Sequence, residues 1–63
     1  MTPNLQAIFD KATDVLGDET KALDWIDHTS ATLGGTPREL SDSKDGTDRV
    51  LLHLGNISRH SFT

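Results

Sequence analysis

Three histidines, ten carboxylates and a glycine pair are the groups in this 63-residue chain that could take part in chemistry. No two of the histidines, at His28, His53 and His60, have the one-turn spacing with a supporting acid that a helical zinc site uses. We therefore expect each histidine to lie on a helix surface or at an interface rather than to bind a metal.

The carboxylates and serines do not form a catalytic pattern either. General acid–base catalysis needs titratable side chains in a water-poor cleft, and a chain of this size can barely enclose one. The serines lack a nucleophile-elbow motif, and the Gly34-Gly35 pair lacks the lysine of a phosphate-binding loop. The sequence therefore predicts no enzyme activity, no cofactor and no metal.

The glycine pair has a structural interpretation instead. Gly34 and Gly35 can adopt a positive φ and reverse the chain. Thr36 and Pro37 then have the types of a helix cap and a first helical residue, and Glu39 can reach back to the cap. These residues predict a tight turn followed by a short helical turn.

Three longer helices are expected around this turn. The first starts at Thr2-Pro3 and ends at Gly17, the second is capped by Asp18, and the last is capped by Asp42 or Ser43 and runs to about Ile57. Apolar residues at helical spacing predict the buried faces. In the first helix they are Leu5, Ile8, Phe9, Ala12, Val15 and Leu16; in the second Ala22, Leu23, Trp25 and Ile26; in the last Val50, Leu51, Leu54 and Ile57. The fold class is all-α, a small bundle of three to four main helices plus the short turn.

Two residues of these helices invite more specific predictions. Trp25, the single tryptophan, is expected at the core or its edge, with an interface anchor as the alternative. Gly55 weakens a helix by about 1 kcal/mol relative to alanine, so we expect another backbone to approach it closely.

Composition limits the classes of function. The chain has no cysteine and no apolar run near the length of a membrane span, and it lacks the pattern of a signal peptide, so we expect a cytoplasmic protein without a membrane partner. Only 33% of its residues are hydrophobic, so a homodimer or another partner is expected to add to the stability of a thin core.

Charge is distributed unevenly along the chain. All ten acidic residues and four of the six basic ones lie in residues 1–48, which carry −6, whereas residues 49–63 carry +2. The overall charge of −4 argues against direct binding of nucleic acid, which requires clustered lysine and arginine. The basic C-terminal end is the part whose charge is set apart from the rest.

Four segments occur in an order typical of one protein family. They are Ala22-Leu23-Asp24-Trp25-Ile26, Leu33-Gly34-Gly35-Thr36-Pro37-Arg38-Glu39-Leu40, Asp45-Gly46-Thr47-Asp48-Arg49-Val50 and Leu54-Gly55-Asn56-Ile57. Over roughly residues 7–62 the chain resembles the toxin-binding domain of the MbcA/ParS/Xre antitoxins.

The resemblance implies a helical domain over residues 1–58 that binds and neutralises a RES-domain toxin, an enzyme that consumes NAD or uses it for ADP-ribosylation. It also implies that a C-terminal tail over residues 59–63 reaches the entrance of the toxin's active site. The matching tail residues are Arg59, His60, Ser61, Phe62 and Thr63. Trp25 and Asn56 are candidates for the rest of the interface.

The sequence departs from the family pattern in two respects. It has no room for the helix-turn-helix domain that many members carry, so we expect a stand-alone toxin-binding module of a bacterial toxin–antitoxin system. Arg59-His60-Ser61 stands where a glycine commonly follows the last helix. A small phage- or host-encoded inhibitor that uses the same fold against another protein is the alternative function.

Overall fold

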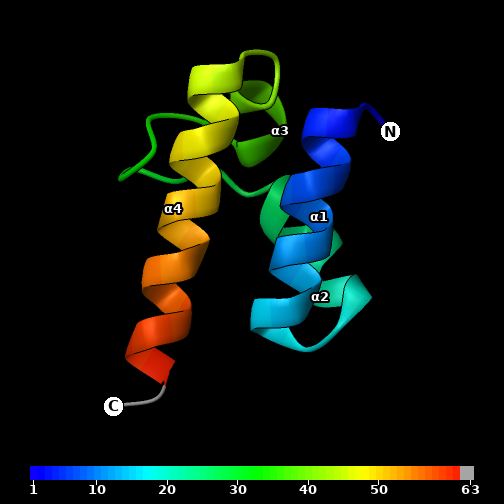
Figure 1. Ribbon diagram of the computed structural model, residues 1–63, viewed down its shortest axis with the longest axis vertical. Coiled ribbons are helices and arrows are strands. Elements are labelled where there is room, and N and C mark those ends of the chain that lie inside the picture. Colours follow the sequence, from blue (N-terminus) through cyan, green and yellow to red (C-terminus); the bar gives the residue numbers. More distant parts are fainter. Residues whose placement is uncertain (62–63) are drawn as a thin grey trace.

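A computed structural model shows four helices and describes residues 1–61, with side chains for residues 1–57. The helices are α1 (Pro3–Leu16), α2 (Glu19–Ile26), α3 (Pro37–Leu40) and α4 (Lys44–Ser61). Helix α1 packs against both α2 and α4, and α3 packs against α4. In Figure 1, α1 and α4 run in the same direction, and the last turn of α4 lies at the opposite end of the molecule from the start of α1. The predicted all-α fold class is confirmed.

Local capping explains where each helix begins and ends. Thr2 accepts a hydrogen bond from the Leu5 N–H (3.2 Å), and α1 ends at Gly17, whose φ is +78°. Asp18 accepts from the Thr20 N–H to cap α2 (3.0 Å). Of the two candidate caps of α4, Ser43 forms the cap, because its side-chain oxygen accepts a hydrogen bond from the Gly46 N–H (3.0 Å).

The Gly-Gly turn forms as predicted. Gly34 has a φ of +81°, and the Ser30 N–H donates to the Gly35 carbonyl across the turn (3.0 Å). The Glu39 N–H then donates to the Thr36 hydroxyl oxygen (3.1 Å), and that hydroxyl donates to the Glu39 carboxylate (3.0 Å). Thr36 therefore caps the N-terminal end of α3 through two hydrogen bonds with Glu39, one with its backbone and one with its side chain.

The core lies between α1, α2 and α4. Its fully enclosed apolar side chains are few and lie at the predicted helical spacing: Leu5, Ile8, Ala12, Ala22, Ile26, Val50 and Leu54. The aromatic and larger aliphatic residues around them are only partly buried, and Leu23 is 44% exposed, so its predicted place on the buried face of α2 is wrong.

A small hydrogen-bond network joins the start of α1 to the turn between α3 and α4. The Ser41 carbonyl accepts hydrogen bonds from the Asn4 amide (3.1 Å) and from the Thr47 hydroxyl (3.4 Å). Ser41 and Thr47 are both buried, so these bonds satisfy groups that would otherwise lack water. This hydrogen-bond network holds the N-terminal ends of α1 and α4 side by side.

Two expectations about α4 are wrong. Its backbone stays helical to Ser61, beyond the predicted end near Ile57. The close backbone approach is at Gly46, where a Cβ would overlap the Leu40 carbonyl oxygen, and not at Gly55, where a Cβ would meet nothing within 4 Å. The α3–α4 turn is tight enough to press one helix end on the other, whereas the surface at Gly55 is open.

Candidate protein-binding surface

The side chain of Trp25 reaches from α2 to α4. Its ring stacks on that of His53, with the ring centres 6.2 Å apart and the planes inclined by 17°. Both side chains are partly buried, and Trp25 packs against the apolar core. The core-edge interpretation of Trp25 is therefore confirmed, and part of its side chain remains exposed.

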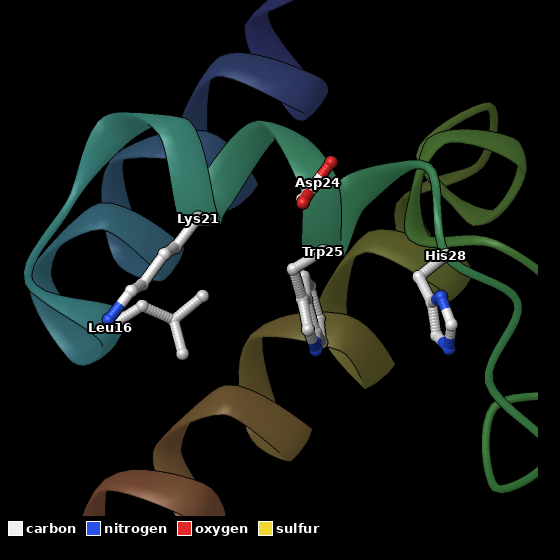
Figure 2. Close-up of a pocket in the computed structure, with 5 residues that line it drawn as sticks. All are labelled: Leu16, Lys21, Asp24, Trp25 and His28. Carbon is white, nitrogen blue, oxygen red and sulfur yellow. The ribbon is translucent and has the colours of Figure 1, made fainter.

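A first open hollow lies on the α2 side of this stack. It is lined by Leu16, Lys21, Asp24, Trp25 and His28. Figure 2 shows the Trp25 ring hanging from α2 between Leu16 and Lys21 on one side and His28 on the other. The hollow has an apolar floor with one cation and one carboxylate at its margin.

A second open hollow, which we call the α4 groove, lies on the other side of His53. It is formed by Thr32 and Leu33 from the α2–α3 loop and by four residues of α4: Arg49, Leu52, His53 and Asn56. The four α4 residues follow the i, i+3, i+4, i+7 spacing of a single helix face. The loop passes beside α4, as Figure 1 shows in green. The Trp25–His53 stack therefore joins a residue of the first hollow to a residue of the α4 groove.

An ion pair holds the α2–α3 loop that forms one wall of the α4 groove. Arg38 donates from Nε to Asp27 Oδ1 at 2.7 Å and from a terminal nitrogen to Oδ2 at 3.5 Å, joining the residue after α2 to α3. The hydrogen bond from Arg38, aided by its charge, lowers the pKa of Asp27, and the same bond raises the pKa of Arg38. Leu33 anchors the loop by packing against the core.

The candidate interface residues from the sequence lie close to each other on this surface. Trp25 lines the first hollow, Asn56 and His53 line the α4 groove, and His53 stacks on Trp25. The structural turn that precedes α3 contains Gly34, Gly35 and Thr36, and Pro37 is the first residue of the helix.

The structure describes only the backbone of the first residues of the proposed tail. The backbone of Arg59, His60 and Ser61 belongs to α4. The side chains of these three residues, and Phe62 and Thr63 altogether, lie outside the described residues.

Sequence reasoning missed Leu33, Arg49 and Leu52 as surface residues. Leu52 is 68% exposed, more than any other large hydrophobic side chain among the described residues. The available signal was its position in α4, because residue 52 lies away from the stripe formed by Val50, Leu54 and Ile57. Leu33 was interpreted only as an anchor of the turn, and Arg49 only as part of the basic end.

The described side chains do not include a metal-ligand cluster. Within residues 1–57, no three histidine, cysteine or carboxylate side chains are grouped so that they could hold a metal ion. No helix within the described part of the chain is both long and apolar enough to cross a bilayer. The surface is instead suited to contacts with a protein, because it combines an aromatic stack, exposed leucine and a few polar groups.

Comparison with known proteins gives one family. The family model described as "Antitoxin Xre/MbcA/ParS C-terminal toxin-binding domain" matches residues 11–58, about three quarters of the chain. No curated protein and no solved structure matches the chain. The matched range contains α2, α3, both hollows, the last six residues of α1 and most of α4.

Proposed function

The chain belongs to the family of antitoxin Xre/MbcA/ParS C-terminal toxin-binding domains, and on this premise we propose that it binds and inhibits a RES-domain toxin. Membership in a toxin-binding family is the observation that carries the proposal. The resemblance described above is the only basis for proposing that this toxin consumes NAD or uses it for ADP-ribosylation.

The proposed mechanism is occlusion by a preformed surface and a C-terminal segment. Residues 1–58 dock beside the toxin's active site through the surface that carries Trp25 and Asn56. Residues 59–63 then block the entrance for substrate. Arg59 faces polar or acidic groups of the NAD pocket, and Phe62 fills an apolar slot that would otherwise take the nicotinamide.

The geometry of α4 supports a link between these two parts. The helix carries the residues of the α4 groove, and its backbone continues without interruption to Ser61. A continuous helix transmits the position of the docked groove to the following residues, because its backbone hydrogen bonds leave little freedom between them. Docking at the groove therefore sets where the C-terminal segment points.

The remaining properties follow from the same proposal. The protein acts in the bacterial cytoplasm, as a binding protein without catalytic activity or cofactor. A homodimer is compatible with the thin core, and no direct binding of nucleic acid is expected.

Co-expression with a RES-domain toxin tests the proposal, with growth and cellular NAD as readouts. Three forms are compared: the full chain, a chain ending at Ile57, and a full-length chain with Arg59→Ala and Phe62→Ala. We expect the full chain to restore growth and NAD, and the two altered forms to fail although circular dichroism shows that they fold. Rescue by all three forms would retain the antitoxin and refute the role of the tail. Rescue by none, across several expressed RES toxins, would favour an inhibitor of another protein.

A further inference from the structure

The α4 groove has a chemical character that differs from the rest of the protein. None of the described residues that line it is acidic, although the whole chain carries −4. Its one permanent cation, Arg49, forms no ion pair with the described side chains, whose ion pairs join Arg38 to Asp27 and Lys44 to Asp48. The groove therefore presents an uncompensated guanidinium on an acidic molecule.

The apolar part of the groove lies next to this cation. Leu33 stands on the loop wall, and Leu52 on the helix wall is 68% exposed. Water contact with this much aliphatic surface is unfavourable, and an aliphatic side chain placed between the two leucines would remove it. Thr32 and Asn56 add groups at the rim that can hydrogen-bond to a backbone.

The walls of the groove are already in place before any partner binds. The Asp27–Arg38 ion pair and the Ser30–Gly35 backbone bond close the loop, and Leu33 is packed against the core. Binding to such a preformed surface has a small ordering cost, so a modest contact area can suffice.

We propose that the α4 groove docks a segment of a protein partner that places a carboxylate beside an aliphatic side chain. The carboxylate pairs with Arg49, for which a guanidinium supplies a two-pronged donor. The aliphatic side chain lies between Leu33 and Leu52. The inference deepens the proposed function, and it rests on that function only for identifying the partner as the toxin.

Selection of random peptides displayed on phage against the full chain tests this proposal without a toxin. We expect the enriched peptides to carry aspartate or glutamate within one helical turn of leucine, isoleucine, valine or phenylalanine. Their affinity should fall about tenfold or more with Arg49→Glu or Leu52→Ser, the scale of a central interface contact.

Matched variants elsewhere on the surface provide the controls. Lys44→Glu makes the same charge change on the same helix at an 89% exposed side chain, and Leu23→Ser removes another exposed leucine. Both should bind the selected peptides within about twofold of the unaltered chain, since neither residue lines the groove. A second selection against the Arg49→Glu chain should replace the acidic residues of the peptides by lysine or arginine.

The proposal is overturned if no acidic–aliphatic peptides are enriched, or if such peptides bind Arg49→Glu and Leu52→Ser as tightly as the unaltered chain. These outcomes are distinct from failure of the proposed function. Peptide selection reports on the groove, whereas co-expression reports on the RES toxin. A groove that selects acidic–aliphatic peptides in a chain that rescues no RES toxin would retain this inference and refute the toxin assignment.

Discussion

Gly46 and Gly55 lie on one helix but in different surroundings. A methyl group at position 46 would overlap the Leu40 carbonyl oxygen, and backbone cannot move aside as a flexible side chain can. A methyl group at position 55 would meet nothing within 4 Å. The same residue type is therefore required at one position and replaceable at the other.

We expect Gly46→Ala to lower the free energy of unfolding by about 1–3 kcal/mol, the usual cost of overpacking. Gly55→Ala should raise it by about 1 kcal/mol, because alanine is the better helix former. Urea denaturation followed by circular dichroism measures both. Equal effects of the two substitutions would contradict the close contact between α4 and the Leu40 carbonyl.

The Trp25–His53 stack can be tested at the same scale. We expect His53→Ala to destabilise the fold by about 0.5–1.5 kcal/mol, the energy of an aromatic pair beyond its buried area. The emission of Trp25 should shift to longer wavelength as its ring becomes more exposed, and Trp25 is the only tryptophan that contributes. The exposed residue Leu52 offers a control, because Leu52→Ala removes no stacking partner. An unchanged emission spectrum in the His53→Ala chain would show that the stack is not formed in solution.

At the scale of elements, the loop between α2 and α3 is the least regular part of the described chain. It contains no helix from Asp27 to Thr36, and its shape depends on a glycine with positive φ, one backbone bridge and one ion pair. Because this loop is a wall of the α4 groove, its anchoring affects binding as well as stability.

Acid should weaken this anchoring through Asp27. Its pKa is lowered in the folded protein by the hydrogen bond from Arg38, so the unfolded chain binds a proton at this site more readily. The stabilisation of the fold by ionised Asp27 is thus fully present above the ordinary pKa of aspartate, about 3.9. It is lost as the pH falls through the lowered pKa of the folded protein. Both side chains are at least half exposed, so the effect is small and screened by salt.

Asp27→Asn isolates this contribution. We expect the unfolding free energies of the Asp27→Asn and unaltered chains to differ at neutral pH and to converge as the pH falls below the lowered pKa of Asp27, measured by thermal or urea unfolding over a pH series. Asp48→Asn, at the exposed Lys44 ion pair, serves as the reference. A difference that persists at the lowest pH would assign the effect of Asp27 to something other than its charge.

At the scale of the whole molecule, stability depends on a small set of side chains. Among the described residues, seven apolar side chains form the buried core cluster, and Ile8 of α1 is one of those that are fully enclosed. A domain of this length has a total stability of roughly 3–9 kcal/mol. A single cavity in the core is therefore a large fraction of the total.

We expect Ile8→Ala to cost about 2–5 kcal/mol and to leave much of the chain unfolded at 37 °C, whereas Ile8→Val should cost about 0.5–1.5 kcal/mol. Calorimetry and urea denaturation measure these losses. A partner that binds only the folded chain should recover part of the loss in proportion to its concentration. A loss below 1 kcal/mol for Ile8→Ala would mean that the core is not packed as the structure has it.

The sequence alone determined the helical class, the caps at Thr2, Asp18 and Thr36, the turn at Gly34 and the buried stripes. These features depend on contacts within a few residues, and capping and helical period leave direct marks in residue type and spacing. The family resemblance could likewise be recognised from four ordered segments, and the match to residues 11–58 confirms it.

Only the tertiary structure decided three contacts. Trp25 stacks on His53, and the backbone of Leu40 closely approaches Gly46 whereas nothing approaches Gly55. Leu33 and Leu52 line one groove together with Arg49. These pairs are separated by six to 28 residues in the chain, as from Leu40 to Gly46 and from Trp25 to His53. Their proximity depends on how the helices cross and on the path of the loop. Helical period fixes which side of a helix a residue occupies, but not which other segment of the chain lies opposite it.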